Sequence, residues 1–540
     1  MERKRQELEI YKGNELTQKE GKGNFFSGVL ILSLSAVIVK IIGLIYKIPV
    51  LRLLGSEGMG YFNSAYEIYA LLCIVSTAGL PVAMSIMISG ERDSDRVEKI
   101  FKISMRLFVI LGALGTALML VLSYPLALFL GNYKSFFSIL AIAPTLFFIC
   151  ITSAYRGYFQ GLSRMLPTAV SQVIEALGKL ILGLAFACVA LNAGFGGEIV
   201  AAFAVLGLLL GSAASSLYLL LVKRLGGGNK PTLNAVGARE INRELLSLAI
   251  PITLSSAVVS VTKMIDMTMI LRRLQSIGYV SEEAFAVYGG YTTLCLPLFS
   301  LAPALIGSVA MPILPKLSGA IARGDRHTQT ETVNDGIRLT SIISMPMATG
   351  LALYSRQILE LLFHGENEAI ELCAPLLTLL AFSVGFSSMV TTGNAILQAY
   401  GHPKIPLAAM GAGAILKIVL AYILIGNRSI NIAGAPISTF FCDLSINVVS
   451  FYFICKIVPG KIRIDKVFVR PFLASVISVG ISRIIYGAVS AKYGEGTIIT
   501  LSAIAVAGLL YCFMCLVLRV IDIKEIKGLL AGRKKTKPDK

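Results

Sequence analysis

The sequence has no tryptophan, three histidines and few charged residues for its length. Only 15% of its 540 residues are charged, whereas hydrophobic residues make up 55% and the mean hydropathy is +0.76. Soluble domains carry about 25% charged residues, so this composition excludes a soluble enzyme and predicts a protein that lies in a bilayer. Without tryptophan, tyrosine must supply the aromatic belt at the membrane interfaces.

Residue types that build metal and redox sites are sparse or badly spaced. His327, His364 and His402 lie in predicted loops and lack ligand spacing. Most of the nine cysteines lie in apolar stretches, so structural disulfides are not expected. Cys512 and Cys515 form a C-x-x-C motif inside an apolar stretch, which favours two small buried side chains. No metal or cofactor is expected.

Long apolar stretches are abundant. A membrane-spanning helix needs about 20 mostly apolar residues, and the sequence offers about fourteen such stretches. They lie near 27–47, 62–88, 103–124, 136–158, 166–190, 198–222, 247–271, 286–312, 337–355, 370–396, 405–425, 431–455, 470–489 and 497–519. The sequence therefore predicts an all-α polytopic membrane protein.

Short words recur in the second half of the chain in the same order. Their offset grows in one direction, from about 221 to about 238, as small loop insertions would make it do. The pairs include Ser35-Ala36-Val37 with Ser256-Ala257-Val258, Val82-Ala83-Met84 with Val309-Ala310-Met311, Arg106-Leu107 with Arg338-Leu339, and Gln160 and Lys179 with Gln398 and Lys417. Two like halves with a site between them are the usual plan of a secondary transporter.

The repeat divides the chain into two six-helix lobes and two further helices. The first lobe spans 27–222 and the second 247–455, with a cytoplasmic interlobe loop over 223–246. Helices thirteen and fourteen occupy 470–519. Basic cytoplasmic tails are expected at 1–26 and 520–540.

Basic residues alternate between the loops. Most of the 49 Lys and Arg fall in the two tails and the even-numbered loops, which predicts that both termini are cytoplasmic. The same distribution accounts for the formal net charge of +18, since these residues would lie beside anionic membrane lipids. A nucleic-acid partner is not needed to explain the charge.

Some charged residues remain inside the predicted spans. Each costs about 2.5–3.5 kcal/mol at the centre of a membrane helix, so it needs a partner or a wet cavity. Lys40 has no acidic residue three or four positions away, which favours a polar cavity. Lys263 and Asp266 are three residues apart on one helix face, and either an internal pair or a direct role in binding explains them.

Other charges carry a similar ambiguity between ion coupling and structure. Glu175 and Lys179 are four residues apart on one helix, with a structural pair favoured. Lys417 and Asp443 lie on the predicted eleventh and twelfth helices and are possible partners across them. Arg483 either extends toward the interface or lines a groove for a lipid tail.

A mixed group of polar residues lies near the helix ends. Arg52, Asn63, Tyr66, Glu67 and Tyr291 combine cationic, amide and aromatic groups. Cations pair with phosphate, while amides and rings meet sugar hydroxyls and faces, so the set suits a sugar diphosphate head group. For the tyrosines, an ordinary interfacial belt is an equal alternative.

Several words resemble a known family. They are Tyr158-Phe159-Gln160-Gly161 with Pro167-Thr168-Ala169, the segment from Lys40 to Pro49, and Gly79-Leu80-Pro81. Over helices one to fourteen the chain resembles stage V sporulation protein B-like exporters. These form a branch of the multidrug/oligosaccharidyl-lipid/polysaccharide (MOP) exporter superfamily that includes MurJ-type lipid II flippases.

The resemblance implies a V-shaped, MATE-like pair of lobes around a central cationic cavity, with helices thirteen and fourteen forming a groove for a polyprenyl tail. It implies a flippase in the cell membrane that moves an undecaprenyl-diphosphate-linked sugar, lipid II, from the inner to the outer leaflet. Lys40, Arg52 and Lys263 lie on the helices that would line the cavity.

Alternatives remain open at this point. One is a different lipid-linked oligosaccharide of teichoic, capsular or spore type. Another is a drug exported in exchange for Na⁺ or H⁺ through Asp266, Glu175 or Asp443. A membrane enzyme acting on polyprenyl phosphate would need clustered carboxylates for a divalent metal or a sizeable soluble domain, and the sequence shows neither.

The spacing of Lys263 and Asp266 generates a test. If they pair, Asp266→Ala alone leaves Lys263 without its partner and should reduce transport more than the double change Lys263→Ala, Asp266→Ala. Transport in vesicles, at matched protein levels, is the measurement. Equal damage from the single and double variants would show that the two residues act separately.

Overall fold

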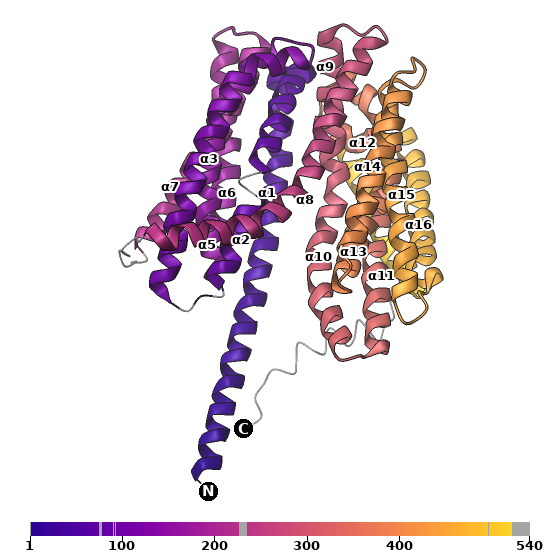
Figure 1. Ribbon diagram of the computed structural model, residues 1–540. Coiled ribbons are helices and arrows are strands. Elements are labelled where there is room, and N and C mark those ends of the chain that lie inside the picture. Colours follow the sequence, from indigo (N-terminus) through magenta and orange to yellow (C-terminus); the bar gives the residue numbers. More distant parts are fainter. Residues whose placement is uncertain are drawn as a thin grey trace. The chain divides into compact units, whose positions relative to one another are not determined.

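The computed structural model describes residues 2–74, 78–89, 91, 93–225, 235–494 and 496–520. Every regular element within these ranges is helical (Figure 1), which confirms the predicted all-α class. The basic segment predicted at 520–540 lies almost wholly outside the described residues. At the other end, the predicted tail at 1–26 belongs to a helix that begins at Glu2.

Twelve helices among the described residues are long and apolar enough to cross a membrane, with one shorter apolar helix at Leu80–Ser89. The first span, Leu34–Ile74, has 41 residues. A straight helix of that length would extend about 60 Å, twice the thickness of the hydrocarbon core. The chain breaks this helix at Gly55, whose φ of 67° favours glycine. Two of the fourteen predicted helices therefore share α1. The exact count of fourteen helices stays a prediction.

The chain divides into two compact units. Unit 1 comprises Met1–Leu271 and Ser281–Gly289. Its elements are α1 (Glu2–Ile74), α2 (Leu80–Ser89), α3 (Ser94–Phe129), α4 (Ser135–Ile142), α5 (Thr145–Gly161), α6 (Met165–Asn192), α7 (Gly197–Leu225), most of α8 (Ala235–Ser276) and α9 (Ser281–Gly290). Helix α5 packs against α2, α3 and α7, and α6 packs against α1 and α7. Leu80, Met84, Phe108, Phe159 and Leu245 belong to its buried core.

Unit 2 comprises Arg272–Val280 and Gly290–Lys540. Its elements are the π-helix η2 (Tyr291–Cys295), α10 (Leu296–Ala322), α11 (Arg326–Leu353), α12 (Ser355–Leu362), α13 (Asn367–Ala399), α14 (Lys404–Ile425), η3 (Asn431–Ala433), α15 (Gly434–Ile457), the π-helix η4 (Asp465–Val469), α16 (Arg470–Tyr493) and α17 (Thr497–Val517). Helix α13 packs against α10 and α11, and α14 packs against α15.

The two units repeat one packing scheme. Contacts of α5 with α2 and α3 in unit 1 correspond to contacts of α13 with α10 and α11 in unit 2, and the pair α6 and α7 corresponds to α14 and α15. This correspondence agrees with the duplication predicted from the repeated words. The interlobe loop expected at 223–246 contains the end of α7 and the start of α8, while 226–234 lie outside the described residues. The predicted lobe boundaries stay predictions.

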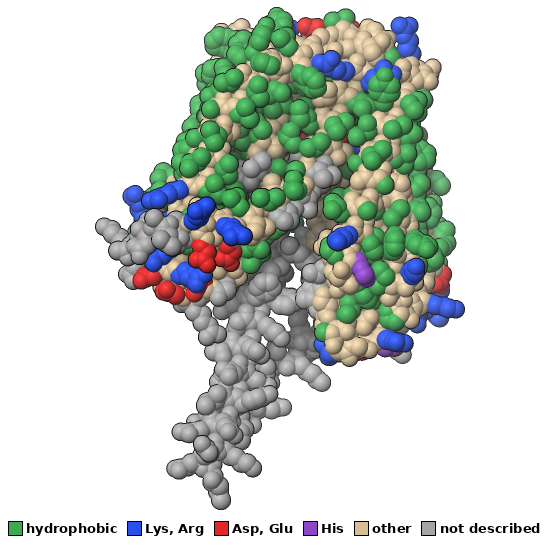
Figure 2. Space-filling model, in the orientation of Figure 1, with side chains coloured by type: hydrophobic (Ala, Val, Ile, Leu, Met, Phe, Trp, Pro, Cys, Tyr) green, Lys and Arg blue, Asp and Glu red, His purple; other side chains and the backbone are tan. Residues whose placement is uncertain are grey.

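Side chains on the visible face are arranged as a membrane requires. In Figure 2, hydrophobic side chains cover the length of each unit, and most Lys, Arg, Asp and Glu side chains gather near helix ends. Large exposed apolar residues such as Val121, Val189 and Ile415 account for this surface. In water such a surface would drive aggregation, whereas in a bilayer it meets lipid tails.

Helices α6 and α7 touch through glycines. A Cβ on Gly178 would lie 2.4 Å from the Cα of Gly211, and a Cβ on Gly207 would lie 2.3 Å from the Cα of Gly183. Membrane helices associate by such close contact of small residues, because burial of apolar surface offers no gain in lipid. The two helices are therefore joined along their length by backbone contact.

The contact predicts a strong effect at one glycine. Gly207→Ala should separate α6 from α7 and destabilise the protein by about 1–3 kcal/mol, seen as a lower midpoint of thermal unfolding in detergent. Gly411→Ala on α14 is the control, because a Cβ there meets nothing within 4 Å. Alanine should leave stability unchanged or raise it at that position. Equal midpoints for both variants would contradict the close contact.

Candidate functional site

Charged side chains of unit 1 gather on α1, α6 and α8. Lys40 on α1 and Lys263 on α8 are both exposed and close enough to repel each other electrostatically. The half-buried carboxylate of Glu67 is attracted to Lys263 and to Lys47, and it is repelled by Asp266. Residues from distant parts of the sequence thus form one group of mixed charge, which we call the α1/α8 charge cluster: Lys40, Lys47, Glu67, Lys263 and Asp266.

Lys179 on α6 lies among aromatic rings of α1. Its Nζ is 4.9 Å from the ring centres of Tyr46 and Tyr66 and 5.5 Å from that of Phe62. The hydroxyl of Tyr46 donates a hydrogen bond to the carbonyl oxygen of Ala204 on α7, which fixes this ring. Cation–π attraction to three rings stabilises the ammonium without neutralising its charge. These contacts join α6 to α1 at Lys179.

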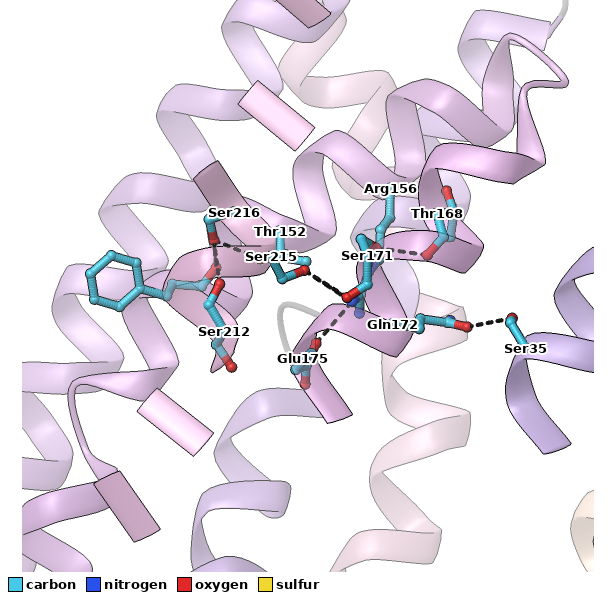
Figure 3. Close-up of polar contacts among 11 residues, drawn as sticks. Ser35, Thr152, Arg156, Thr168, Ser171, Gln172, Glu175, Ser212, Ser215 and Ser216 are labelled. Atoms are coloured by element: carbon cyan, nitrogen blue, oxygen red, sulfur yellow. Dashed lines mark hydrogen bonds and ion pairs between the residues drawn. The ribbon is translucent and has the colours of Figure 1, made fainter. Parts of the chain in front are cut away.

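Glu175, one turn earlier on α6, pairs with Arg156 on α5. An Nη of Arg156 lies 2.8 Å from Glu175 Oε2, and Arg156 Nε donates to the hydroxyl of Ser171 at 2.9 Å (Figure 3). The hydroxyl of Ser215 on α7 donates to the carbonyl oxygen of Ser171. Glu175 therefore has an ion-pair partner on another helix, in addition to its attraction to Lys179.

Neighbouring hydrogen bonds orient the helices that carry these charges. Ser35 on α1 donates to the side-chain oxygen of Gln172 on α6 at 3.0 Å (Figure 3). The hydroxyls of Thr152 on α5 and Ser216 on α7 are 2.7 Å apart. Lipid tails offer no groups that compete for such hydrogen bonds. These bonds therefore fix the rotation of α1, α5 and α7 relative to α6.

A second charged group lies beyond the break in α1. Lys134 bridges Glu57 at 3.7 Å and Glu282 of α9 at 3.4 Å. Burial lowers the pKa of Lys134, but the hydrogen bond to Glu282 and the charges of both carboxylates outweigh burial and raise that pKa above its usual value. The hydroxyl of Tyr61 donates to Glu57 and accepts from the amide of Asn132. These contacts hold α9 against α1.

Unit 2 carries its own buried charge. Asp443 on α15 is attracted to Lys417 on α14, as expected for partners across helices. Among the described residues, Asp443 Oδ2 is buried with no hydrogen-bond partner. Arg483 lies over the rings of Tyr354 and Tyr486, at 5.5 and 5.1 Å, so it packs on aromatic faces. Tyr291 is buried in η2.

The structure brings some predicted residues together and leaves others apart. Lys40, Glu67, Lys263 and Asp266 belong to the α1/α8 charge cluster, whereas Arg52 is exposed on α1. Asn63 is buried on α1, and Tyr66 faces Lys179.

Lys47 and Arg156 were missed by the sequence analysis. Lys47 lies seven residues after Lys40 on one helix, a spacing that returns to the same face and could have identified it. Arg156 lies close to the predicted end of its span and so resembled an interfacial residue. Nothing in the local sequence pairs it with Glu175, which is 19 residues away.

Among the described residues, no three His, Cys, Asp or Glu side chains lie close enough together to hold a metal ion. The chemistry that the described groups offer is electrostatic: exposed ammonium groups beside carboxylates, rings and hydroxyls. Such groups are chemically suited to an anionic or polar ligand.

Comparison with known proteins identifies the class of protein. The fold matches that of MOP superfamily transporters: an inward-facing multidrug MATE transporter superposes with a TM-score of 0.66 at 17% identity, over 80% of this chain and 97% of the other. Lipid II flippase MurJ in an inward closed conformation gives a TM-score of 0.70 at 15% identity, over 90% and 98%. These likenesses establish the fold, that of a multi-pass membrane protein.

The chain belongs to the polysaccharide biosynthesis protein family, whose model matches residues 25–318, more than half of its length. The MatE model matches residues 251–423. Curated relatives from Bacillus subtilis (strain 168) include uncharacterized membrane protein YabM and stage V sporulation protein B. Each is 25% identical and covers 95% of this chain, with 96% and 99% of the relatives' own lengths matched. Lipid II flippase MurJ of the same organism is 25% identical over 73% of this chain and 76% of its own.

The Arg156–Glu175 pair can be tested by a double-mutant cycle. Removing either partner of a partly buried pair leaves the other charge without it. Arg156→Ala or Glu175→Ala should therefore each lower the free energy of unfolding by at most about 3–5 kcal/mol. The double variant should cost clearly less than the sum of the two. Thermal unfolding of the purified variants measures this. Additive losses would show that the pair contributes no coupling.

Proposed function

We propose that this protein is a flippase for an undecaprenyl-diphosphate-linked sugar, most specifically the peptidoglycan precursor lipid II. The observation that carries the proposal is the presence of two exposed ammonium groups, Lys40 and Lys263, on membrane helices of one unit, where they repel each other electrostatically. Each would be costly in hydrocarbon, and their mutual repulsion adds to that cost. Both are explained if they face a wet space that receives an anionic head group.

The physical problem of flipping supports this assignment. A diphosphate and its sugars lose their hydration if they enter hydrocarbon, so they do not cross unaided. Fixed cations lower the cost for the diphosphate, and the hydroxyl and aromatic groups nearby suit the sugars. In the α1/α8 charge cluster, Lys40, Lys47 and Lys263 are the cations for this role. Glu67 and Asp266 limit their mutual repulsion.

Family relationships point to the same substrate class. The matching family is described by polysaccharide biosynthesis, and a relative is named as a lipid II flippase. Lipid-linked oligosaccharides are thus the class we assign, with transfer from the inner to the outer leaflet of the cell membrane and both termini cytoplasmic. We assign binding of the polyprenyl tail to helices α16 and α17, which pack together.

A second candidate is a different lipid-linked oligosaccharide with a role in sporulation. The relative named stage V sporulation protein B matches 95% of this chain, whereas lipid II flippase MurJ matches 73%. The buried carboxylate of Asp443 and its neighbour Lys417 would suit coupling to Na⁺ or H⁺ with either substrate.

A complementation experiment tests the first candidate. In a bacterium depleted of its lipid II flippase, expression of this chain should restore growth. Lys40→Ala, Lys47→Ala and Lys263→Ala should each reduce rescue, because each removes a cation assigned to the diphosphate. Lys404→Ala, which changes an exposed lysine at the start of α14, is the control and should rescue fully.

Protein levels in the membrane must match for each variant. Failure of the unaltered chain to rescue despite good expression would favour the second candidate. Full rescue by Lys40→Ala and Lys263→Ala together would contradict the assigned role of the α1/α8 charge cluster.

A further inference from the structure

Unit 2 contains an apolar groove. Its volume is about 750 Å³, within the range of ligand pockets. It lies between α11, α13, α15 and the segment that leads into η4, and its walls include Ile337, Phe386, Met389, Phe451 and Phe468. Val448 and Tyr452 on α15 line the groove while 63% and 62% exposed, so the groove is open to the exterior.

The groove has the length of one membrane leaflet. Its lining residues on α15 run from Leu444 to Lys456, a separation of twelve positions or about 18 Å along a helix. Half of the hydrocarbon core measures about 15 Å. The amide of Asn447, which lines the groove, donates its hydrogen bonds to the carbonyl oxygens of Phe386 and Asp443. An acyl chain could therefore lie along the groove.

One end of the groove is strongly basic. Lys456 lines the groove at the end of α15, and the following segment adds the exposed residues Lys461, Arg463 and Lys466. Within the part of the chain that the structure describes, no carboxylate forms a salt bridge with any of these four. The neighbouring Asp465 is engaged by Arg470 at 3.3 Å.

The basic segment is held in place before any ligand binds. The side chain of Asn334 on α11 accepts a hydrogen bond from the backbone N–H of Arg463 at 3.0 Å and donates to the carbonyl oxygen of Lys461 at 3.5 Å. A Cβ on Gly460 would lie 2.5 Å from the hydroxyl oxygen of Thr330, so the backbone there touches α11. Because the basic segment is already ordered, it loses little conformational entropy on binding.

We propose that this groove binds an anionic phospholipid, with one acyl chain along α15 and its phosphate at Lys456 and Lys466. On the predicted topology this segment is cytoplasmic, and that leaflet carries the anionic lipids. The apolar walls fit a chain and the unpaired cations fit a phosphate, so the two ends of the groove match the two ends of one lipid molecule.

Native mass spectrometry of the whole purified protein tests the proposal. Phosphatidylglycerol and phosphatidylcholine with identical palmitoyl and oleoyl chains are titrated separately. Phosphatidylglycerol should bind more tightly. Lys456→Gln and Lys466→Gln should each weaken its binding about fivefold and weaken phosphatidylcholine binding less, because choline offsets the charge of that lipid's phosphate. Lys404→Gln is the matched control and should change neither.

Blocking the groove tests the position of the chain. Val448→Trp, or Ile464→Trp at a second exposed lining position, should reduce binding of both lipids, whereas Ile415→Trp on the exposed face of α14 should not. Equal affinity for the two lipids, or no effect of either blocking variant, would overturn the proposal. Loss of undecaprenyl phosphate binding instead of phosphatidylglycerol binding would assign the groove to the substrate tail. Because binding is measured without transport, the result is independent of the proposed flippase activity.

Discussion

A charge inside a bilayer needs a partner or water, and this constraint organises unit 1. Arg156 forms an ion pair with a carboxylate, and Lys179 lies among three aromatic rings. Lys223, at the end of α7, contacts both a carboxylate and aromatic rings. Lys223 Nζ lies 2.8 Å from Glu98 and 4.3 Å from the ring centre of Phe101. Each of these cations is satisfied by groups on another helix, so each also holds helices together.

The cations of the α1/α8 charge cluster are different. Lys40 and Lys263 keep exposed side chains, and carboxylates near them, such as Glu67, are shared among several lysines. The exposure of these two lysines, in contrast to the fixed pairs elsewhere in the unit, is the reason we propose this cluster for an anionic head group. Close backbone contact with α7 holds α6 in place. Lys179 of α6 in turn contacts rings of α1, the helix that carries part of the cluster.

The sequence was sufficient to predict the fold class. Membrane spans are recognised from the length of apolar stretches, and the internal repeat is recognised from short sequences that recur in the same order. The non-helical break at Gly55 falls in the gap that the sequence left between the stretches 27–47 and 62–88. The helical backbone nevertheless extends to that glycine from both sides, and apolar length alone does not reveal such helix ends. The site was only partly predictable. Periodicity finds neighbours on one helix, such as Lys263 and Asp266, whereas the partner of Glu175 is Arg156 on α5 and depends on how helices pack. Likewise, Lys179 was assigned a carboxylate partner, yet its nearest described neighbours are rings contributed by α1.

Because rings do not neutralise an ammonium group, the aromatic surroundings of Lys179 leave its charge in place. Together with Lys40, Lys47 and Lys263 it gives four formal positive charges, against two negative ones on Glu67 and Asp266, a formal excess of two. Such an excess senses the transmembrane voltage: displacing one charge through 100 mV changes the free energy by about 2.3 kcal/mol. A conformational step that moved this excess charge along the membrane normal would therefore be electrogenic, and its equilibrium would depend on the membrane potential.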